Sequence, residues 1–157
     1  MNIRLILVGK TEESYLKQGI SQYCGRLEHY CKFSLLEIPE LKNAKSLTRE
    51  QIKDKEGELI LKNVAPGDCL CLLDERGRMF TSVEWAAHLE KKFLYSPRDI
   101  TFVIGGSYGF GEAVYARADE KISLSKMTFS HQLCRVIFLE QLYRAFTIIK
   151  GEPYHHE

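Results

Sequence analysis

The chain has 157 residues, of which 45% are hydrophobic and 27% charged, and its formal net charge is +1. These values are typical of a globular chain and exclude a disordered or fibrous one, and the small net charge excludes a global positive field that would recruit nucleic acid. Because no window approaches the roughly 20 apolar residues of a membrane span and the N-terminus lacks a secretory signal, we expect a cytoplasmic protein built as a single domain over residues 1–157.

Strands and helices are expected to alternate in the first part of the chain. Apolar runs indicate strands, and apolar residues at helical spacing indicate helices. Thr48 and Gln51 also have the spacing of a capping box, which marks the start of a helix. The expected elements are a strand over residues 3–8, a helix over 12–27, a strand over 33–38 and a helix over 48–63.

The same alternation continues after the helix-breaking pair Pro66-Gly67, and Thr81 with Glu84 repeats the capping-box spacing. Strands that are apolar throughout and alternate with helices predict an α/β fold, with a parallel sheet covered on both faces. The expected elements are a strand over residues 68–74, a turn at 75–78, a helix over 81–94, a strand over 99–104, a glycine-rich loop over 105–111, a short helix over 112–118 and a strand over 121–124.

The last helix is apolar nearly all the way round from Leu133 to Ile149, with Ser130 or Thr128 as its expected N-cap. A helix of this kind is buried. A sheet can cover one side of it, but the sequence shows no obvious second layer for the other. We therefore expect a second copy of the chain to cover it. Gly151 suits the helix C-cap, and the residues that follow form a separate tail.

Three loops leave the carboxyl ends of expected strands: the one after Leu73, the glycine-rich loop 105–111, and residues 124–129. Ligands of open parallel sheets bind beyond such ends, so the loops form one pocket if their strands are neighbours. The glycine-rich loop matches neither standard phosphate fingerprint, so the ligand need not carry phosphate. A tight structural turn explains the glycines equally well.

A metal site is not expected. His131, His155 and His156 invite that interpretation, but adjacent histidines on a tail do not make a rigid chelate, and no acidic or thiol partner is evident. The five cysteines are odd in number and lack a Cys-x-x-Cys spacing. We expect them to be reduced thiols.

Several motifs together resemble one known family. They are Gly105-Gly106-x-x-Gly109, Leu124-Ser125-x-x-Thr128-x-x-His131, Arg135-Val136, Glu140-Gln141-Leu142-Tyr143-Arg144-Ala145 and Gly151-x-Pro153-Tyr154-His155. This pattern resembles the RlmH family, ribosomal RNA large-subunit pseudouridine N3-methyltransferases of the SPOUT superfamily, and the likeness spans the whole chain.

The resemblance implies a parallel-sheet SPOUT methyltransferase fold with a C-terminal trefoil knot, and a homodimer. It implies methylation of N3 of a pseudouridine in 23S ribosomal RNA, as free RNA or within the assembled ribosome. It also implies S-adenosylmethionine as the cofactor. By position, the family's cofactor contacts correspond to Leu73, Gly105, Leu124, Ser125, Lys126, Met127, Thr128 and Phe129.

Roles at the acceptor are assigned on the same resemblance. Tyr154 is the first candidate for positioning the substrate, with His131 and His155 as further catalytic candidates. Arg135 and Arg144 are expected to contact the RNA backbone or to brace the dimer, and His156 is expected to contact the RNA. Two positions depart from the family pattern: Ser130 stands where relatives commonly have proline, and His156 where they commonly have arginine or lysine.

Two other functions compete with this one. An NAD- or nucleotide-dependent α/β enzyme is disfavoured by the missing phosphate fingerprint. A non-catalytic ribosome-binding module with the same fold is compatible with the sequence, because function depends on the site rather than on the fold.

Overall fold

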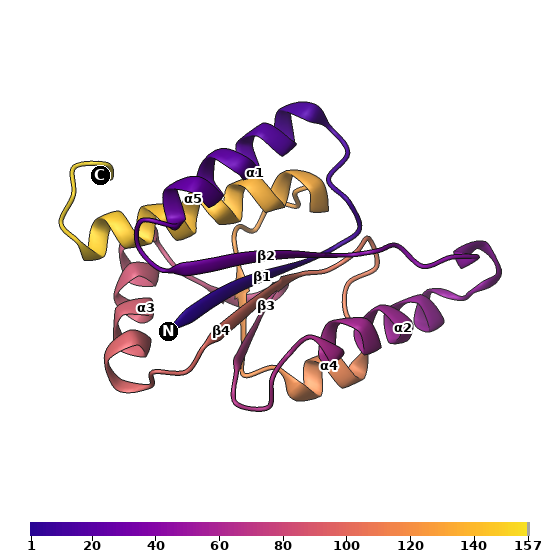
Figure 1. The fold of residues 1–157 in the computed structure, drawn as a ribbon. Coiled ribbons are helices and arrows are strands. Elements are labelled where there is room, and N and C mark those ends of the chain that lie inside the picture. Colours follow the sequence, from indigo (N-terminus) through magenta and orange to yellow (C-terminus); the bar gives the residue numbers. More distant parts are fainter. Residues whose placement is uncertain (157) are drawn as a thin grey trace.

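The computed structural model describes residues 1–156. Five strands, all parallel, form one sheet in the order β2-β1-β4-β3-β5 (Figure 1). This confirms the predicted α/β fold with a parallel sheet. The elements are β1 (Asn2–Val8), α1 (Ser14–Leu27), β2 (Lys32–Ile38), the 3-10 turn η1 (Ala44–Ser46), α2 (Arg49–Lys62), β3 (Cys69–Met79), α3 (Ser82–Tyr95), β4 (Ile100–Ile104), α4 (Glu112–Arg117), β5 (Glu120–Ser123) and α5 (His131–Ile149).

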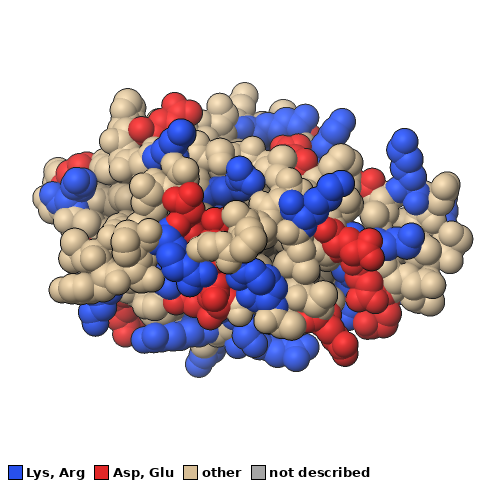
Figure 2. Space-filling view, turned by 60° about the horizontal axis from the view of Figure 1, so that its bottom comes forward, with Lys and Arg blue, Asp and Glu red and all other residues tan. Residues whose placement is uncertain are grey.

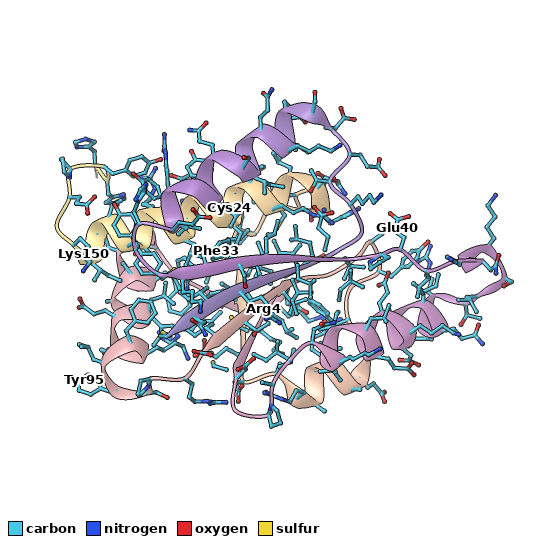
Figure 3. All side chains as sticks on the ribbon, viewed as in Figure 1. Arg4, Cys24, Phe33, Glu40, Tyr95 and Lys150 are labelled. Carbon is cyan, nitrogen blue, oxygen red and sulfur yellow. The ribbon has the colours of Figure 1, made fainter. Side chains whose placement is uncertain are left out.

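Helices cover both faces of the sheet, with α1, α3 and α5 on one side and α2 and α4 on the other (Figure 1). Alternate residues of β1 supply the two cores: Leu5 and Leu7 belong to the first, and Ile6 and Val8 to the second. The strands are therefore apolar throughout because each face of the sheet is buried. Side chains fill the space on either side of the sheet (Figure 3).

The helix ends follow the predicted signals. Thr48 and Thr81 each form a complete capping box. Ser130, rather than Thr128, caps α5, because its hydroxyl accepts a hydrogen bond from the Leu133 N–H (3.1 Å). At the other end of α5, Gly151 has φ +70°, a left-handed conformation that glycine adopts without strain.

The structure corrects the predicted turn at residues 75–78. β3 continues to Met79, and Ile122 of β5 pairs with both Leu73 and Arg78, so the intervening residues bulge away from the ladder and return to it. Gly77 makes the return possible. A Cβ at this position would lie 2.5 Å from the Ile122 backbone, which no side chain tolerates.

α5 occupies a slot on the sheet between α1 and α3. Phe138, Leu139 and Leu142 are fully buried there, and Gly19 lets α1 approach closely, since a Cβ at Gly19 would lie 3.1 Å from Val136. The second layer that the sequence did not reveal is thus supplied by this chain itself. The all-round apolar pattern of α5 no longer requires a second copy, although Leu133 remains 38% exposed.

The molecular surface mixes both signs of charge. On the face that Figure 2 presents, lysines and arginines are interleaved with acids, and no large area carries one sign alone. Within residues 1–156, no helix combines the length and the apolar character needed to cross a bilayer.

Candidate active site

The three strand-end loops meet in one pocket because β3 lies between β4 and β5 in the sheet. The cavity has a volume of about 540 Å³, within the range of about 300–1,000 Å³ typical of small-molecule sites. Its floor includes Leu73 with the bulge that follows it in β3, Ile104 at the end of β4, and Ile122 of β5. The convergence predicted from the strand ends is confirmed.

Most of the residues expected to contact a cofactor lie on this cavity. Lys126 is the exception, because its side chain is exposed and does not line the wall. The lining members of the predicted set are Leu73, Gly105, Leu124, Ser125, Met127, Thr128 and Phe129.

The loop after β5 is shaped by local hydrogen bonds. The Ser123 hydroxyl donates to the Ser125 carbonyl (3.0 Å), and the Ser125 hydroxyl accepts from the Met127 N–H (3.0 Å). Such serine turns fix the local path of the main chain. They turn the loop around the pocket and leave Lys126 pointing outward.

The glycine-rich loop packs closely against the Phe110 ring and against α2. A Cβ at Gly105 would lie 3.0 Å from the Phe110 ring, and one at Gly106 would lie 3.0 Å from both carboxylate oxygens of Glu56 on α2. The Gly109 N–H donates to the Gly106 carbonyl (3.2 Å), which closes a turn. The loop is therefore both a tight structural turn and a wall of the pocket.

The pocket carries more negative than positive charge. Among the described residues that line it, Asp74 and Glu75 are acids and Arg76 is the only basic side chain besides His131. Asp74 is fixed in place, since it accepts hydrogen bonds from the Tyr115 hydroxyl and from the Arg76 N–H (2.8 Å). Burial and the bond to Asp74 raise the pKa of Tyr115 to about 12, so the phenol remains a donor at neutral pH.

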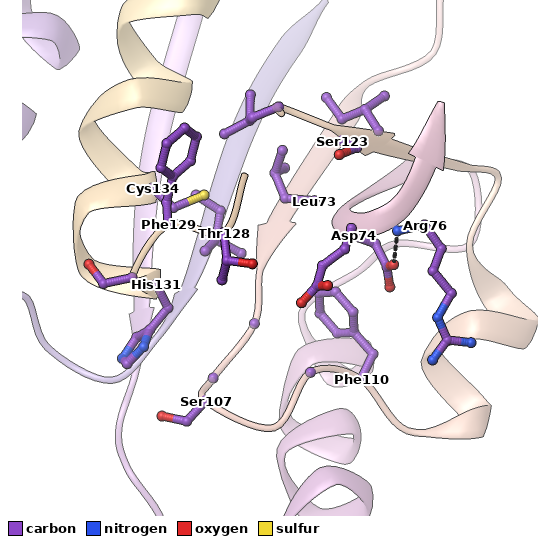
Figure 4. Close-up of a pocket in the computed structure, with 18 of the residues that line it drawn as sticks. Leu73, Asp74, Arg76, Ser107, Phe110, Ser123, Thr128, Phe129, His131 and Cys134 are labelled. Carbon is purple, nitrogen blue, oxygen red and sulfur yellow. Dashed lines mark hydrogen bonds between the residues drawn. The ribbon is translucent and has the colours of Figure 1, made fainter. Parts of the chain in front are cut away.

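His131 stands at the first turn of α5 and lines the same cavity. Figure 4 shows it with Thr128 and Phe129 on one side of the pocket, and Asp74 with Phe110 on the other. Burial, followed by the charge of Arg135, lowers the pKa of His131 below its ordinary value. The imidazole is therefore neutral at pH 7 and can accept a proton.

The structure does not bring Tyr154 and His155 to this pocket. They follow the far end of α5, a 19-residue helix that is about 28 Å long at 1.5 Å per residue. The Tyr154 hydroxyl donates to Glu140 (3.0 Å), and Arg144 donates to both Glu140 (2.6 Å) and Nδ1 of His155 (3.0 Å). The tail thus joins a polar network of its own.

The expected RNA contacts differ in accessibility. His156 is exposed, and Arg144 is half-buried in the network with Glu140. Arg135, however, is 0% exposed and donates to the Val8 carbonyl (2.7 Å) and the Thr11 hydroxyl (2.9 Å). A side chain in this position cannot reach RNA. Arg135 instead ties the first turns of α5 to the end of β1.

Some residues of the pocket were not predicted from the sequence. Asp74 could have been found, because it directly follows Leu73 in the loop that the sequence predicted beside the pocket. Tyr115 gave no signal, because it lies on α4 and meets Asp74 only through the fold. Within residues 1–156, no group of three or more metal-binding side chains lies together.

An open parallel sheet whose three strand-end loops enclose one acid-lined pocket defines an α/β protein with a cofactor-sized ligand site. The model of a family described as "Predicted SPOUT methyltransferase" matches residues 1–155. The chain belongs to the SPOUT methyltransferase family.

Curated relatives match along their whole length, and each is named "Ribosomal RNA large subunit methyltransferase H". The protein from Parabacteroides distasonis is 57% identical over 157 residues, which is 100% of both chains. The one from Bacteroides fragilis is 54% identical over the same span. The one from Christiangramia forsetii is 53% identical over 156 residues, or 99% of each chain.

Proposed function

We propose that this protein transfers a methyl group from S-adenosylmethionine to N3 of a pseudouridine in the RNA of the large ribosomal subunit. Full-length relatives that are 53–57% identical and named as ribosomal RNA methyltransferases support the reaction class. The observation that carries the choice of cofactor is the charge of the pocket, where the carboxylates of Asp74 and Glu75 outnumber the guanidinium of Arg76.

This charge balance suits S-adenosylmethionine better than NAD. The former carries a sulfonium and an ammonium against one carboxylate and is a net cation, whereas the diphosphate of NAD is anionic. A cavity with excess carboxylate stabilises a cation and repels a diphosphate. The absence of a phosphate-binding fingerprint in the glycine-rich loop supports the same choice.

Several features of the pocket fit this cofactor. Leu73, Ile104 and Ile122 form an apolar floor suited to a purine, and the main chain of loop 124–129 offers polar groups around it. Asp74, held by Tyr115, would face the positively charged part. When bound, S-adenosylmethionine supplies its methyl group as an electrophile.

The acceptor nitrogen requires a proton acceptor, because N3 of pseudouridine is protonated at neutral pH and attacks well only after losing that proton. Neutral His131 on the pocket wall is our candidate. A positioned base of this kind typically contributes ~10²–10⁴ in rate. Burial and its hydrogen bonds raise the pKa of Tyr154 well above the ordinary value, so Tyr154 stays protonated and is suited to positioning the substrate rather than to acting as a base.

The tail can serve this chemistry only at the pocket of a second copy, because α5 separates it from its own. We therefore include a homodimer in the proposal, together with the trefoil knot that the family resemblance implies. Exposed Tyr15 on α1 and Leu133 on α5 are apolar side chains available to an interface. The enzyme would act on ribosomes in the cytoplasm.

Calorimetric titration with S-adenosylmethionine and with NAD tests the cofactor, and methyl transfer to large ribosomal subunits bearing the unmethylated pseudouridine tests the reaction. We expect binding of the first ligand alone, and a methyl group on N3 found by mass spectrometry of the nucleoside. NAD binding would contradict the proposal. Subunit binding without methyl transfer would identify a non-catalytic module instead.

A further inference from the structure

The turn after β4 presents a large aromatic side chain at the mouth of the pocket. Ser107 and Tyr108 stand between Gly106 and Gly109, whose hydrogen bond closes the turn, and Gly109 has φ +82°. Both intervening residues line the cavity, and Tyr108 is 45% exposed. The turn therefore holds the ring at the rim, in contact with the cavity and with solvent.

An arginine lies over this ring. Arg49, the first residue of α2, places its guanidinium carbon 4.9 Å from the centroid of Tyr108. Arg49 is exposed, and within the described part of the chain it forms no ion pair with an acid. The pair thus combines an accessible aromatic ring and an accessible cation at one point of the pocket mouth.

A base can enter the pocket only after it leaves its stack, and the neighbouring base then loses a stacking partner. Proteins that bind unstacked RNA replace such partners with aromatic rings and arginine planes. The need for a local contact is strong here, because the net charge of +1 supplies no global positive field to attract RNA. Met127, 77% exposed on the facing loop, is a second apolar contact at the same mouth.

We propose that Tyr108 and Arg49 bind the ribosomal RNA nucleotide adjacent to the methylated base, a role that rests on the proposed function. The base of that nucleotide stacks on the Tyr108 ring, and the Arg49 guanidinium contacts its phosphate. Tyr108 and Arg49 are positioning residues in this scheme: they hold the RNA so that the acceptor base enters the pocket.

Binding of the protein to unmethylated large ribosomal subunits, measured across a series of salt concentrations, separates the two contacts. Tyr108→Ala should weaken binding about 10-fold or more through lost stacking and leave the salt dependence unchanged, whereas Tyr108→Phe should bind like the unmodified protein. Arg49→Ala should weaken binding and reduce the slope of log affinity against log salt by about 0.7, the value for one phosphate contact on a single strand. Arg49→Lys should retain the slope.

Two matched controls lie away from the mouth. Tyr95→Ala removes an aromatic side chain that is 81% exposed at the end of α3, on the opposite face of the sheet from α2 (Figure 3). Arg4→Ala removes an exposed arginine near the start of β1, at the amino ends of the strands, where it donates to the Asn63 carbonyl (3.2 Å). Both should leave subunit binding and its salt slope unchanged.

A purely structural role for Arg49 and Tyr108 would give a different result. If Arg49 and Tyr108 only fixed the loop to α2, their alanine variants would lose affinity for S-adenosylmethionine in calorimetry, and this loss would overturn the inference. Unchanged subunit binding by Tyr108→Ala, in a protein that still methylates its RNA, would also overturn it while leaving the proposed function intact. Failure of the unmodified protein to methylate the RNA would contradict both the proposed function and this inference.

Discussion

The two ends of α5 carry opposite kinds of site. At the first turn, His131 faces a cavity built from strand ends, glycines and apolar side chains. Beyond the last turn, Tyr154 and His155 join Glu140 and Arg144 in a network of polar side chains. The first site can enclose a ligand. The second has no cavity of its own among the described pockets and can only offer groups to something brought to it.

Under the proposed function, one chain holds two halves of a site that do not meet within it. A cofactor needs close main-chain approach, which the sheet edge provides, whereas an acceptor must be held by side chains that reach outward. Both halves were predicted to be catalytic. Because about 28 Å of helix separates them, the proposed function requires the tail to act at the pocket of another copy.

Removing the tail should have the largest effect on activity. Truncation after Pro153 should reduce methyl transfer by about 10²-fold or more, since misplacing an acceptor by about 1 Å can cost that much. Affinity for S-adenosylmethionine should not change. Loss of the Tyr154 contacts with Glu140 and Tyr143 should lower the free energy of unfolding by only about 1 kcal/mol. Single-turnover methylation of large ribosomal subunits measures the rate, and full activity would show that the tail is dispensable.

Mixing two inactive variants tests whether the halves meet between copies. Gly105→Val should abolish cofactor binding, because its side chain would collide with Phe110 and fill the pocket wall, yet it leaves the tail intact. An equal mixture with the tail-truncated variant, after subunit exchange, should recover about a quarter of the unmodified activity, as half the dimers would carry one complete site. No recovery from two folded, exchanging variants would place both halves in the same chain or exclude the tail.

Phenol–carboxylate pairs occur at both ends of α5, which allows a matched comparison. Tyr115→Phe should weaken S-adenosylmethionine binding about 3- to 10-fold, because Asp74 loses a hydrogen bond that fixes it in the pocket. Tyr30→Phe removes the bond to Glu152 near the tail (2.6 Å) and should leave that affinity unchanged. Calorimetric titration measures both, and an equal effect of the two substitutions would contradict the assignment of Asp74 to the cofactor.

The smallest expected effect is on stability as a function of pH. The folded pKa of His131 lies below its unfolded value of 6.5, so the unfolded chain binds the proton more readily. The contribution of this residue is therefore full above pH 6.5 and is lost as the pH falls through that value towards the folded pKa. His131→Gln should reduce the loss of stability between pH 7.5 and 5.5, measured by urea denaturation. If the variant lost as much stability between these pH values as the unmodified protein, His131 would not be the group that causes the loss.

Local signals made much of the fold predictable. Apolar strands and the capping boxes at Thr48 and Thr81 act within a few residues, and each was confirmed. The strand-end loops were predictable because parallel strands bring their carboxyl ends to one edge. The bulge after Leu73 was not, since it depends on Ile122, a residue far along the chain.

The directions of individual side chains also could not be predicted from the sequence. Arg135 was assigned to RNA on the family resemblance, but it is buried, and its partner, the Val8 carbonyl, becomes visible only in three dimensions. Lys126 was assigned to the cofactor by position within a motif, but the serine turn around Ser125 directs it outward. A sequence motif predicts the position of the main chain better than it predicts the direction of a side chain.

The edge position of β5 has a consequence for how the pocket fluctuates. This four-residue strand pairs only with β3 among the described strands, and the loop that follows it forms one wall of the cavity. Edge segments open locally at a lower free energy than central strands do. The amide protons of Ile122 and Ser123 should therefore exchange with deuterium well before those of β4, and a ligand held by loop 124–129 should slow that exchange selectively. Local opening of β5 would give the proposed cofactor a route in and out while the rest of the sheet stays paired.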